Sequence, residues 1–179
     1  MSEPYSETQK RITKESVFTA LMKLLDKRNF SEITITEITK VAGVSRAAFY
    51  RNYATKEDII IFRLRDLFQV LLIKLQALEN RNKLNRTRLC FSFFKEHSGF
   101  IEMLIKAELT HIFYEQFCIH VTDFFKNQTD KFSKSTLFEK YLPQYIASGL
   151  FRVLLEWVKN GTVESVDEIS EFMFEVTAS

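Results

Sequence analysis

Residues 35–53 read ITEITKVAGVSRAAFYRNY, two short helical patterns separated by a glycine. Thr34, just before the first pattern, and Glu37 form a capping box, which predicts that a helix begins between them. Gly43 is expected to end that helix, because glycine adopts a positive φ angle without steric cost. Ser45 is a favourable N-cap for the second helix. Two short helices joined by a tight glycine turn predict a helix-turn-helix motif.

The second helix of this motif carries more aromatic and cationic side chains than a core requires. Helical periodicity turns Val44 and Phe49 inward and leaves Arg46, Tyr50, Arg51 and Asn52 outside. A helix of barely two turns is marginally stable alone, so we expect it to be held by packing on its neighbours. Outward guanidinium and phenol groups hydrogen-bond phosphates and base edges, so the motif predicts a helix that enters the major groove of DNA.

The rest of the chain is also expected to be helical. Only 4 Gly and 2 Pro occur in 179 residues, too few turn signals for a chain of many short strands. Apolar residues recur at helical spacing from Val17 to Leu25, and this first helix is expected to end with Asn29 in the left-handed conformation. Further helices are predicted at about 56–80, 86–96, 98–107, 109–127 and 138–160, with a last one after Ser165.

The net charge is small but unevenly distributed. Residues 1–66 carry 12 basic and 9 acidic side chains, a net charge of +3, whereas the remaining residues have a net charge of −1. A locally basic surface attracts a polyanion, so the N-terminal part is the better candidate for binding nucleic acid.

Cysteine and hydropathy patterns indicate the environment of the protein. Cys90 and Cys118 have no CxxC spacing, which predicts neither a disulfide framework nor a zinc finger and fits a reduced cytoplasm. No stretch approaches the ~20 apolar residues of a membrane-spanning helix. The N-terminal residues MSEPYSETQK are polar and do not resemble a secretory leader. A soluble cytoplasmic protein without a membrane partner is therefore expected.

Residues 17–61 resemble the DNA-binding region of TetR-family transcriptional regulators. The resemblance is carried by VFTALMKLLDKRNF and then ITEITKVAGVSRAAFYRNYATKEDII, in the order and register of that family. Two residues depart from its pattern: Asn29 stands where glycine is usual, and Asn52 where histidine is frequent. The resemblance implies an all-α fold of about nine helices, with a helix-turn-helix domain in residues 1–56 and a helical regulatory and dimerisation domain in residues 57–179.

The resemblance also implies a set of DNA-contacting residues. Tyr50 and Arg51, with Ala47 close to the bases, would read sequence, and a second group would bind phosphates, since base contacts specify and phosphate contacts position. That second group is Thr36, Ser45, Arg46, Asn52, Tyr53 and Lys56. Structural alternatives stay open for three of these: Tyr53 is equally a core residue, Lys56 a solvated lysine, and Ser45 a helix cap in any case.

A short recognition helix contacts few base pairs, so specific binding calls for two copies about 34–36 Å apart, that is, a homodimer on a palindromic operator of double-stranded DNA. Two apolar stripes near the C-terminus are candidate dimer surfaces: Ile146, Leu150, Val153 and Trp157, and then Ile169, Phe172, Met173 and Val176. In TetR-family proteins two such helices of each subunit pair into a four-helix bundle. The alternative is that both stripes belong to the core of one subunit.

Aromatic and apolar residues between these regions are candidates for a ligand site. The family resemblance implies a cavity for a small inducer of unknown identity, which changes the affinity for operator DNA and so releases a repressor. The candidate lining residues are Phe91, Phe94, Phe100, Met103, Leu104, Phe113 and Phe117. No cofactor is predicted.

Three alternatives to a ligand-released repressor exist. Glu108, His111 and Glu115 recur at spacings of three and four, with Cys118 beyond them, which makes them candidate metal ligands, whereas a solvated helix edge is the simpler interpretation. A DNA-binding adaptor or activator controlled by a protein partner has the same sequence signature. An enzyme is not expected, because no glycine-rich phosphate loop, HExxH motif or nucleophile elbow occurs.

Overall fold

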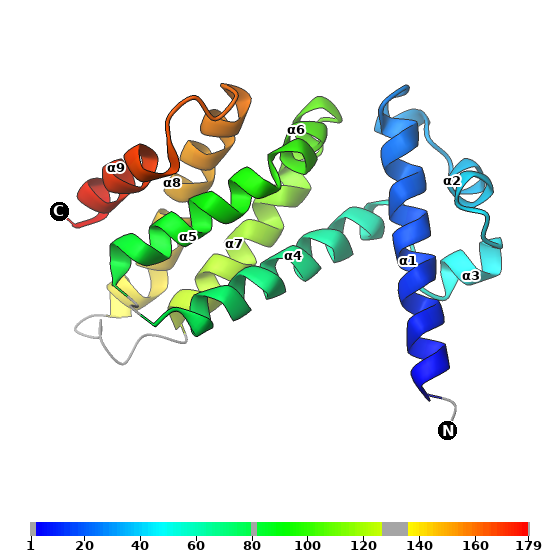
Figure 1. Cartoon of the computed structure of the whole chain (residues 1–179), viewed down its shortest axis with the longest axis horizontal. Coiled ribbons are helices and arrows are strands. Elements are labelled where there is room, and N and C mark those ends of the chain that lie inside the picture. Colours follow the sequence, from blue (N-terminus) through cyan, green and yellow to red (C-terminus); the bar gives the residue numbers. More distant parts are fainter. Residues whose placement is uncertain (1–2, 80–81, 127–135, 179) are drawn as a thin grey trace. The chain divides into compact units, whose positions relative to one another are not determined.

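The computed structural model describes residues 3–79, 82–126 and 136–178, and all regular elements in those ranges are helical, which confirms the all-α fold (Figure 1). In chain order they are α1 (Glu3–Leu25), the 3-10 turn η1 (Phe30–Glu32), α2 (Ile35–Ala42), α3 (Arg46–Tyr50), α4 (Glu57–Ala77), α5 (Lys83–Glu96), α6 (Ser98–Lys106), α7 (Thr110–Lys126), α8 (Thr136–Lys159) and α9 (Val166–Ala178). None of the described helices combines the length and the apolar character needed to cross a membrane.

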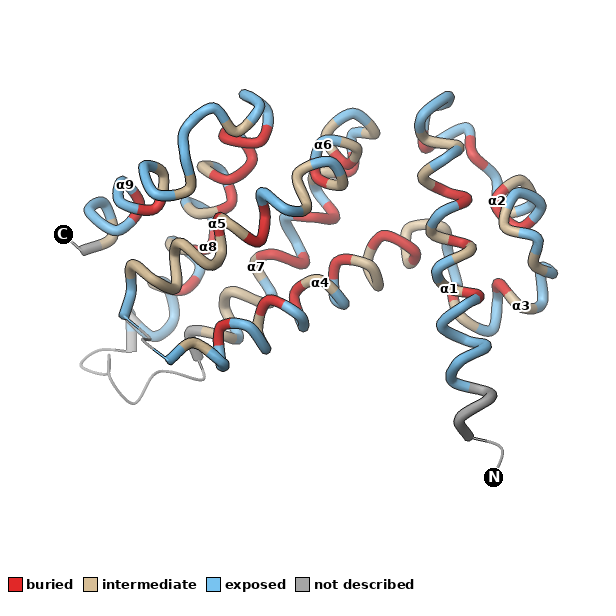
Figure 2. The backbone as a smooth tube through the Cα atoms, viewed as in Figure 1, coloured by how far each residue is buried: buried red, intermediate tan, exposed pale blue. Residues whose placement is uncertain are grey.

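The chain forms two compact units. The N-terminal unit is Met1–Arg65 and the C-terminal unit is Asp66–Ser179, so α4 contributes residues to both. In the N-terminal unit, α2 and α3 pack against α1 and against each other (Figure 1). Val17 and Leu21 of α1, Ile38 of α2 and Phe49 of α3 are fully buried there. Figure 2 shows buried stretches on each of these three helices. The apolar stripe of the first predicted helix is therefore a core face.

Local signals set the ends of the short helices as predicted. The Thr34 hydroxyl accepts a hydrogen bond from the Glu37 amide, and the Glu37 carboxylate accepts one from the Thr34 amide at 2.9 Å, so the capping box is confirmed. Gly43 ends α2 with φ = 68° and ψ = 29°, the left-handed conformation expected of it. Ser45 caps α3 by accepting a hydrogen bond from the Ala48 amide at 3.1 Å.

The end of α1 differs from the prediction. Asn29 is extended, with φ = −68° and ψ = 144°, and is not in the left-handed conformation. The amides of Lys27 and Arg28 both bond to the Leu24 carbonyl, so the helix has closed its last turn before Asn29, which then begins η1. A helix that closes its final carbonyls in this way needs no left-handed residue.

The C-terminal unit is a helical bundle formed by the rest of α4 and by α5 to α9. α7 packs along α8, α5 packs along α9, and α6 contacts both α7 and α8 (Figure 1). Phenylalanine is prominent in its core: Phe91, Phe93, Phe94, Phe113 and Phe117 are all at most 8% exposed. Edge-to-face contacts such as that of Phe113 with Phe117, whose ring centroids are 6.1 Å apart, add to the energy of burial.

α5 begins three residues earlier than expected. The sequence predicts a polar connector before Arg86, whereas α5 already starts at Lys83 because the Asn82 side chain accepts a hydrogen bond from the Asn85 amide at 2.7 Å. The earlier start places Lys83 on the same helix as Arg86, next to the cavity described below.

Candidate nucleic-acid interface and ligand cavity

The outer face of α3 and its C-cap residue present three exposed side chains with polar or cationic ends, Arg46, Tyr50 and Arg51. Tyr50 is 48% exposed, and the Arg46 guanidinium carbon lies 5.9 Å from the centroid of its ring, a cation–π arrangement. The neighbouring Phe49 is fully buried and meets the Tyr50 ring edge-on at 5.4 Å. This is the orientation that the helical periodicity predicts.

Tyr53 is a core residue of the N-terminal unit. It is 4% exposed, and its ring centroid lies 5.4 Å from that of Phe49 and 5.5 Å from that of Phe62. Of the two interpretations that the sequence leaves open, the structure favours the core one over the phosphate contact. The cluster of three rings also explains how a helix of only five residues is held in place.

The other predicted phosphate contacts near α3 differ in exposure and in whether their side chains already hydrogen-bond within the protein. Asn52 is half-buried, and its amide nitrogen donates to the Ala48 carbonyl at 2.8 Å, so it closes the end of α3. Ser45 is exposed, with its hydroxyl used as the helix cap. Thr36 and Ala47 are exposed as well.

Lys56 has internal partners that neither of its sequence interpretations includes. Its ammonium donates to the Phe30 carbonyl at 2.6 Å and to the Ile33 carbonyl at 2.9 Å, with a longer bond of 3.3 Å to Ser31. The ammonium also lies 4.4 Å from the centroid of the Phe30 ring. Lys56 immediately precedes α4, and its side chain therefore ties the start of α4 to the segment between α1 and α2.

Replacing Lys56 with methionine is expected to lower the free energy of unfolding by about 1–3 kcal/mol, because partly buried carbonyls lose a charged donor. Methionine keeps an apolar stem of similar length, so the loss reports on the ammonium group. The measurement is urea denaturation of the full chain followed by far-ultraviolet circular dichroism. Lys40, an exposed lysine of α2, supplies the control, and Lys40→Met is expected to change the stability by less than about 0.5 kcal/mol. Equal stability of the two variants would contradict the structural role of Lys56.

An ion pair connects the end of α1 with α2. Arg28 donates to the Glu37 carboxylate at 2.5 Å and to the Glu32 carbonyl at 2.7 Å. The Thr34 amide, followed by the Arg28 guanidinium, holds the pKa of the Glu37 carboxyl down at about 2. The carboxylate is therefore ionised at neutral pH, as both the capping box and the ion pair require.

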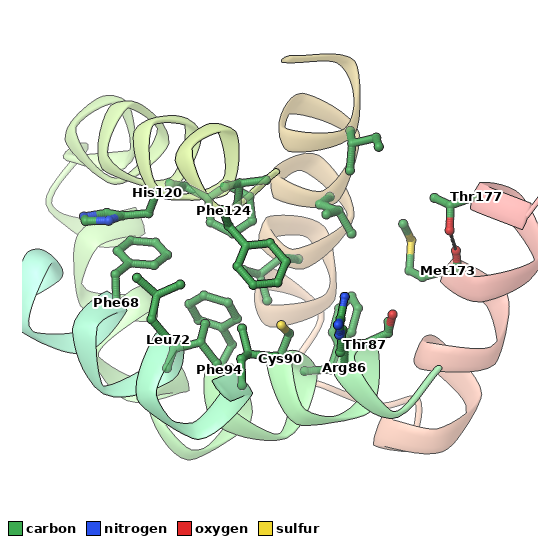
Figure 3. A pocket seen from close by; sticks show the side chains of 18 of the residues that line it. Phe68, Leu72, Arg86, Thr87, Cys90, Phe94, His120, Phe124, Met173 and Thr177 are labelled. Carbon is green, nitrogen blue, oxygen red and sulfur yellow. Dashed lines mark hydrogen bonds between the residues drawn. The ribbon is translucent and has the colours of Figure 1, made fainter. Parts of the chain in front are cut away.

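A cavity of about 370 Å³ lies inside the C-terminal unit (Figure 3). Five helices line it, each with residues from one face spaced mainly three or four apart. The lining residues are Phe68, Leu71, Leu72 and Leu75 of α4; Lys83, Arg86, Thr87, Cys90, Phe91 and Phe94 of α5; Phe117, His120, Val121 and Phe124 of α7; Leu142, Ile146, Leu150 and Leu154 of α8; and Met173 and Thr177 of α9.

Most of the cavity wall is apolar, but the start of α5 is polar. Figure 3 shows Arg86, Thr87 and Cys90 projecting from α5 into the cavity. The Lys83 ammonium donates to the Thr177 carbonyl near the end of α9. Burial raises the pKa of the Cys90 thiol to about 12, so this thiol is neutral at physiological pH. The cavity thus offers donors at one end and hydrocarbon elsewhere.

Sequence reasoning located part of this wall. Of the predicted ligand residues, Phe91, Phe94 and Phe117 line the cavity, whereas Phe100, Met103, Leu104 and Phe113 do not. Leu104 and Phe113 are at most 1% exposed and belong to the packed core. The cationic end of the cavity, formed by Lys83 and Arg86, was not predicted from the sequence. A signal for it exists in the spacing of Lys83, Arg86, Thr87, Cys90, Phe91 and Phe94, which all fall on one face of a helix that begins at Lys83.

Trp157 lies inside the C-terminal unit and not on a surface that a second subunit could cover. It is 3% exposed and packs edge-on against Phe91, with the ring centroids 5.4 Å apart. Its indole nitrogen donates to the Glu164 carbonyl at 3.1 Å. The expected role of Trp157 in a dimer surface is therefore replaced by a role in the core of the subunit.

The other residues of the two predicted dimer stripes have different environments. Met173 is 4% exposed and lines the cavity, which corrects its placement on a dimer surface, and the half-buried Ile146 and Leu150 line the cavity as well. Val153 and Ile169 are half-buried, while Phe172 and Val176 are 50% and 55% exposed. The correction has a simple cause: an apolar stripe shows that a helix face avoids water, without showing which neighbour covers it.

The candidate metal ligands are not assembled into a site. Glu108 lies in the turn between α6 and α7 with φ = 59°, so it does not share a helix with His111 and Glu115. Across the ranges that the structure describes, no three His, Cys, Asp or Glu side chains are placed to hold a metal ion.

Two family models match the chain. The model of bacterial regulatory proteins of the tetR family matches residues 17–61, and the TetR_C_8 model of a transcriptional regulator C-terminal region matches residues 82–179. A curated relative is the HTH-type transcriptional regulator AlkX of Mycobacterium tuberculosis, 30% identical over 56 residues. That alignment spans 31% of this chain and 26% of AlkX.

Solved structures share the fold along nearly the whole chain. Lin0861 from Listeria innocua has a TM-score of 0.79 at 20% identity, covering 96% of this chain and 91% of its own. A TetR transcriptional regulator from Streptococcus agalactiae 2603V has a TM-score of 0.66 at 19% identity, covering 96% and 97%. FadR from Bacillus subtilis, solved with stearoyl-CoA, has a TM-score of 0.54 at 15% identity, covering 90% and 96%.

These likenesses establish the fold, and the family models identify the lineage. One model covers the helix-turn-helix region and the other covers more than half of the chain. The chain belongs to the TetR family of transcriptional regulators.

Proposed function

We propose that this chain binds double-stranded DNA as a homodimer and represses transcription until a small molecule enters the cavity of the C-terminal unit. The observation that carries the proposal is the outer face of α3, where Arg46, Tyr50 and Arg51 are exposed while Phe49 fixes the inner face. In helix-turn-helix proteins a helix of this kind lies in the major groove. Residues 1–56 act as the reader in this proposal, and residues 57–179 regulate and dimerise.

The side chains of the helix-turn-helix have different roles in this proposal of DNA recognition. Tyr50 and Arg51 read base edges, and the small side chain of Ala47 allows the helix to approach the bases. Arg46 and Thr36 bind phosphates and so position the helix. Because the Arg46 guanidinium already lies over the Tyr50 ring, both side chains have less conformational freedom to lose on binding.

Dimerisation follows from the small size of the DNA-binding helix α3. A helix of five residues contacts few base pairs, so two copies about 34–36 Å apart are needed for a specific site. Exposed apolar side chains on the two C-terminal helices supply a surface for a second copy. These are Tyr141 and Tyr145 of α8, 52% and 77% exposed, and Phe172 and Val176 of α9.

The cavity supplies a means of control, and α4 connects it with the reader. α4 contains Ile60, buried in the N-terminal unit, and also Phe68 and Leu71 of the cavity wall. A ligand that changes the packing of α4 binds the DNA-bound and free forms with different affinities, which is the thermodynamic requirement for an effector. The FadR structure contains stearoyl-CoA. For this chain the support for an effector is its own cavity.

Selection of DNA from a pool of random-sequence duplexes tests this function with the full-length protein. We expect an enriched palindromic motif, and an affinity for it that falls as salt rises, because phosphate binding releases counterions. Light scattering should give twice the subunit mass of 21.1 kDa. A pool without enrichment, or binding that does not respond to salt, would reject the DNA-binding proposal.

A further inference from the structure

The cavity of the C-terminal unit is cationic at one end and apolar along most of its length. Along α5, Lys83 and Arg86 come first, Thr87 follows, and Phe91 and Phe94 lie further on. At about 1.5 Å per residue, the two cations occupy about 5 Å of the helix axis, and the stretch from Thr87 to Phe94 about 10 Å. A ligand that fills the cavity therefore meets charge at one end and hydrocarbon along the rest.

The charge at this end of the cavity has one sign. Among the described residues that line it, two are cationic and none is Asp or Glu. Arg86 lies within the wall, its guanidinium carbon 5.9 Å from the centroid of the Phe124 ring (Figure 3). Cations in a largely apolar wall favour an anionic ligand group over a neutral or cationic one.

The donors at this end match a carboxylate. A guanidinium such as that of Arg86 presents a planar fork of N–H groups to two oxygen atoms. The Lys83 ammonium has three N–H donors, of which one goes to the Thr177 carbonyl. Thr87 lines the same end one residue along the helix, but its hydroxyl already donates to the Lys83 carbonyl at 2.9 Å. Arg86 and Lys83 are therefore the side chains at this end whose several N–H groups can donate to a small anion.

The rest of the cavity matches a hydrocarbon chain of medium length. Its volume of about 370 Å³ holds about twelve water-sized groups of about 30 Å³ each. Phe68, Phe94 and Phe117 form much of the wall beyond Thr87, and the Cys90 thiol between them is neutral. Apart from Cys90 and His120, the described residues that line this part are apolar, so a hydrocarbon chain fits it better than a second charged group.

We propose that the cavity binds an amphiphilic carboxylate of medium chain length, with its carboxylate on Arg86 and Lys83 and its chain along Phe94 and Phe117. The proposal rests on the proposed function in one respect, namely that the cavity is the effector site.

Decanoate, with about twelve non-hydrogen atoms, is a suitable probe, and 1-decanol and decylammonium share its chain. Each is titrated into the full-length protein by calorimetry below its micelle concentration. Decanoate is expected to bind at least about tenfold more tightly than 1-decanol, because hydrogen bonds to charged groups are the strongest available. Decylammonium is expected to show no binding. Equal or tighter binding of 1-decanol would overturn the proposal, and this comparison needs no variant protein.

Two variants locate the bound carboxylate and its chain. Arg86→Met is expected to bring the affinity for decanoate close to that for 1-decanol, whereas Lys106→Met, at an exposed lysine of α6, should leave the preference unchanged. Cys90→Trp fills the middle of the cavity and should abolish binding of both probes. A preference for decanoate that survives Arg86→Met in folded protein would overturn the proposed placement.

A third experiment separates this inference from the proposed function. Decanoate, but not 1-decanol, is expected to lower the affinity of the protein for the selected duplex at least about tenfold. This follows if decanoate binds the free protein more tightly than the DNA-bound protein. If the protein binds its duplex but no probe binds the protein, the ligand class is wrong and the DNA-binding function stands. If no duplex is enriched while decanoate binds with the expected preference, the ligand class stands and the regulator function fails.

Discussion

Replacing Tyr50 with alanine is expected to reduce binding to the selected duplex by about a thousandfold, while helix content and dimer mass stay unchanged. A buried interface tyrosine contributes about 2 kcal/mol or more, and the loss occurs in both subunits of a dimer. The fold should survive because Tyr50 is 48% exposed and the inner face of α3 is held by Phe49. Fluorescence anisotropy of a labelled duplex at fixed salt measures the change in affinity.

Tyr114 supplies the matched control for this variant. It is 40% exposed on α7, in the C-terminal unit, so Tyr114→Ala removes an exposed tyrosine outside the helix-turn-helix and should leave the DNA affinity unchanged. If Tyr50→Ala binds the duplex as tightly as the unmodified protein, the face of α3 assigned to the bases is wrong. A loss of dimer mass in Tyr50→Ala would instead assign the residue to the subunit interface.

Replacing Trp157 with alanine is expected to lower the free energy of unfolding by about 3–5 kcal/mol, the usual cost of truncating a buried aromatic side chain. The variant loses the contact with the Phe91 ring and leaves the Glu164 carbonyl without its indole donor. Denaturant unfolding followed by far-ultraviolet circular dichroism measures the change. Protein concentration must be equal in all samples, because the stability of a dimer depends on it.

Ile73→Ala is the control for Trp157→Ala, since Ile73 is 65% exposed on α4 in the same unit. Its effect should stay within about 0.5 kcal/mol. The competing interpretation of Trp157 as an interface residue makes a different prediction. If Trp157 were an interface residue, Trp157→Ala would leave the folded subunit intact and halve the mass measured by light scattering. That outcome would contradict the core assignment.

The local structure of the helix-turn-helix could be predicted nearly residue by residue. Thr34 and Glu37 satisfy each other's amides, Gly43 closes α2, and Ser45 caps α3. Each of these signals acts between residues at most five apart, so the order of side chains is enough to identify it. The exposure of Tyr50 follows from the same short-range periodicity.

Residues whose partners are distant in the chain could not be predicted in this way. Lys56 bonds to carbonyls 23 and 26 residues earlier, and Trp157 packs against Phe91 of another helix. Asn29 was expected to be left-handed, but the hydrogen bonds of the preceding turn made that conformation unnecessary. For Lys56 and Trp157 the decisive partner depends on how the helices are arranged, whereas the end of α1 is set by local hydrogen bonds.

The amino-acid sequence by itself determined the helical composition, the helix-turn-helix, and which helix faces are apolar. Tertiary structure alone decided that Trp157 belongs to the core, that Ile146 and Leu150 line a cavity, and that the cationic start of α5 meets the same cavity. The physical reason is that hydrophobic burial has no direction. Helical periodicity shows that a face leaves water, whereas the packing of the other helices decides whether a core, a ligand or a second subunit covers it.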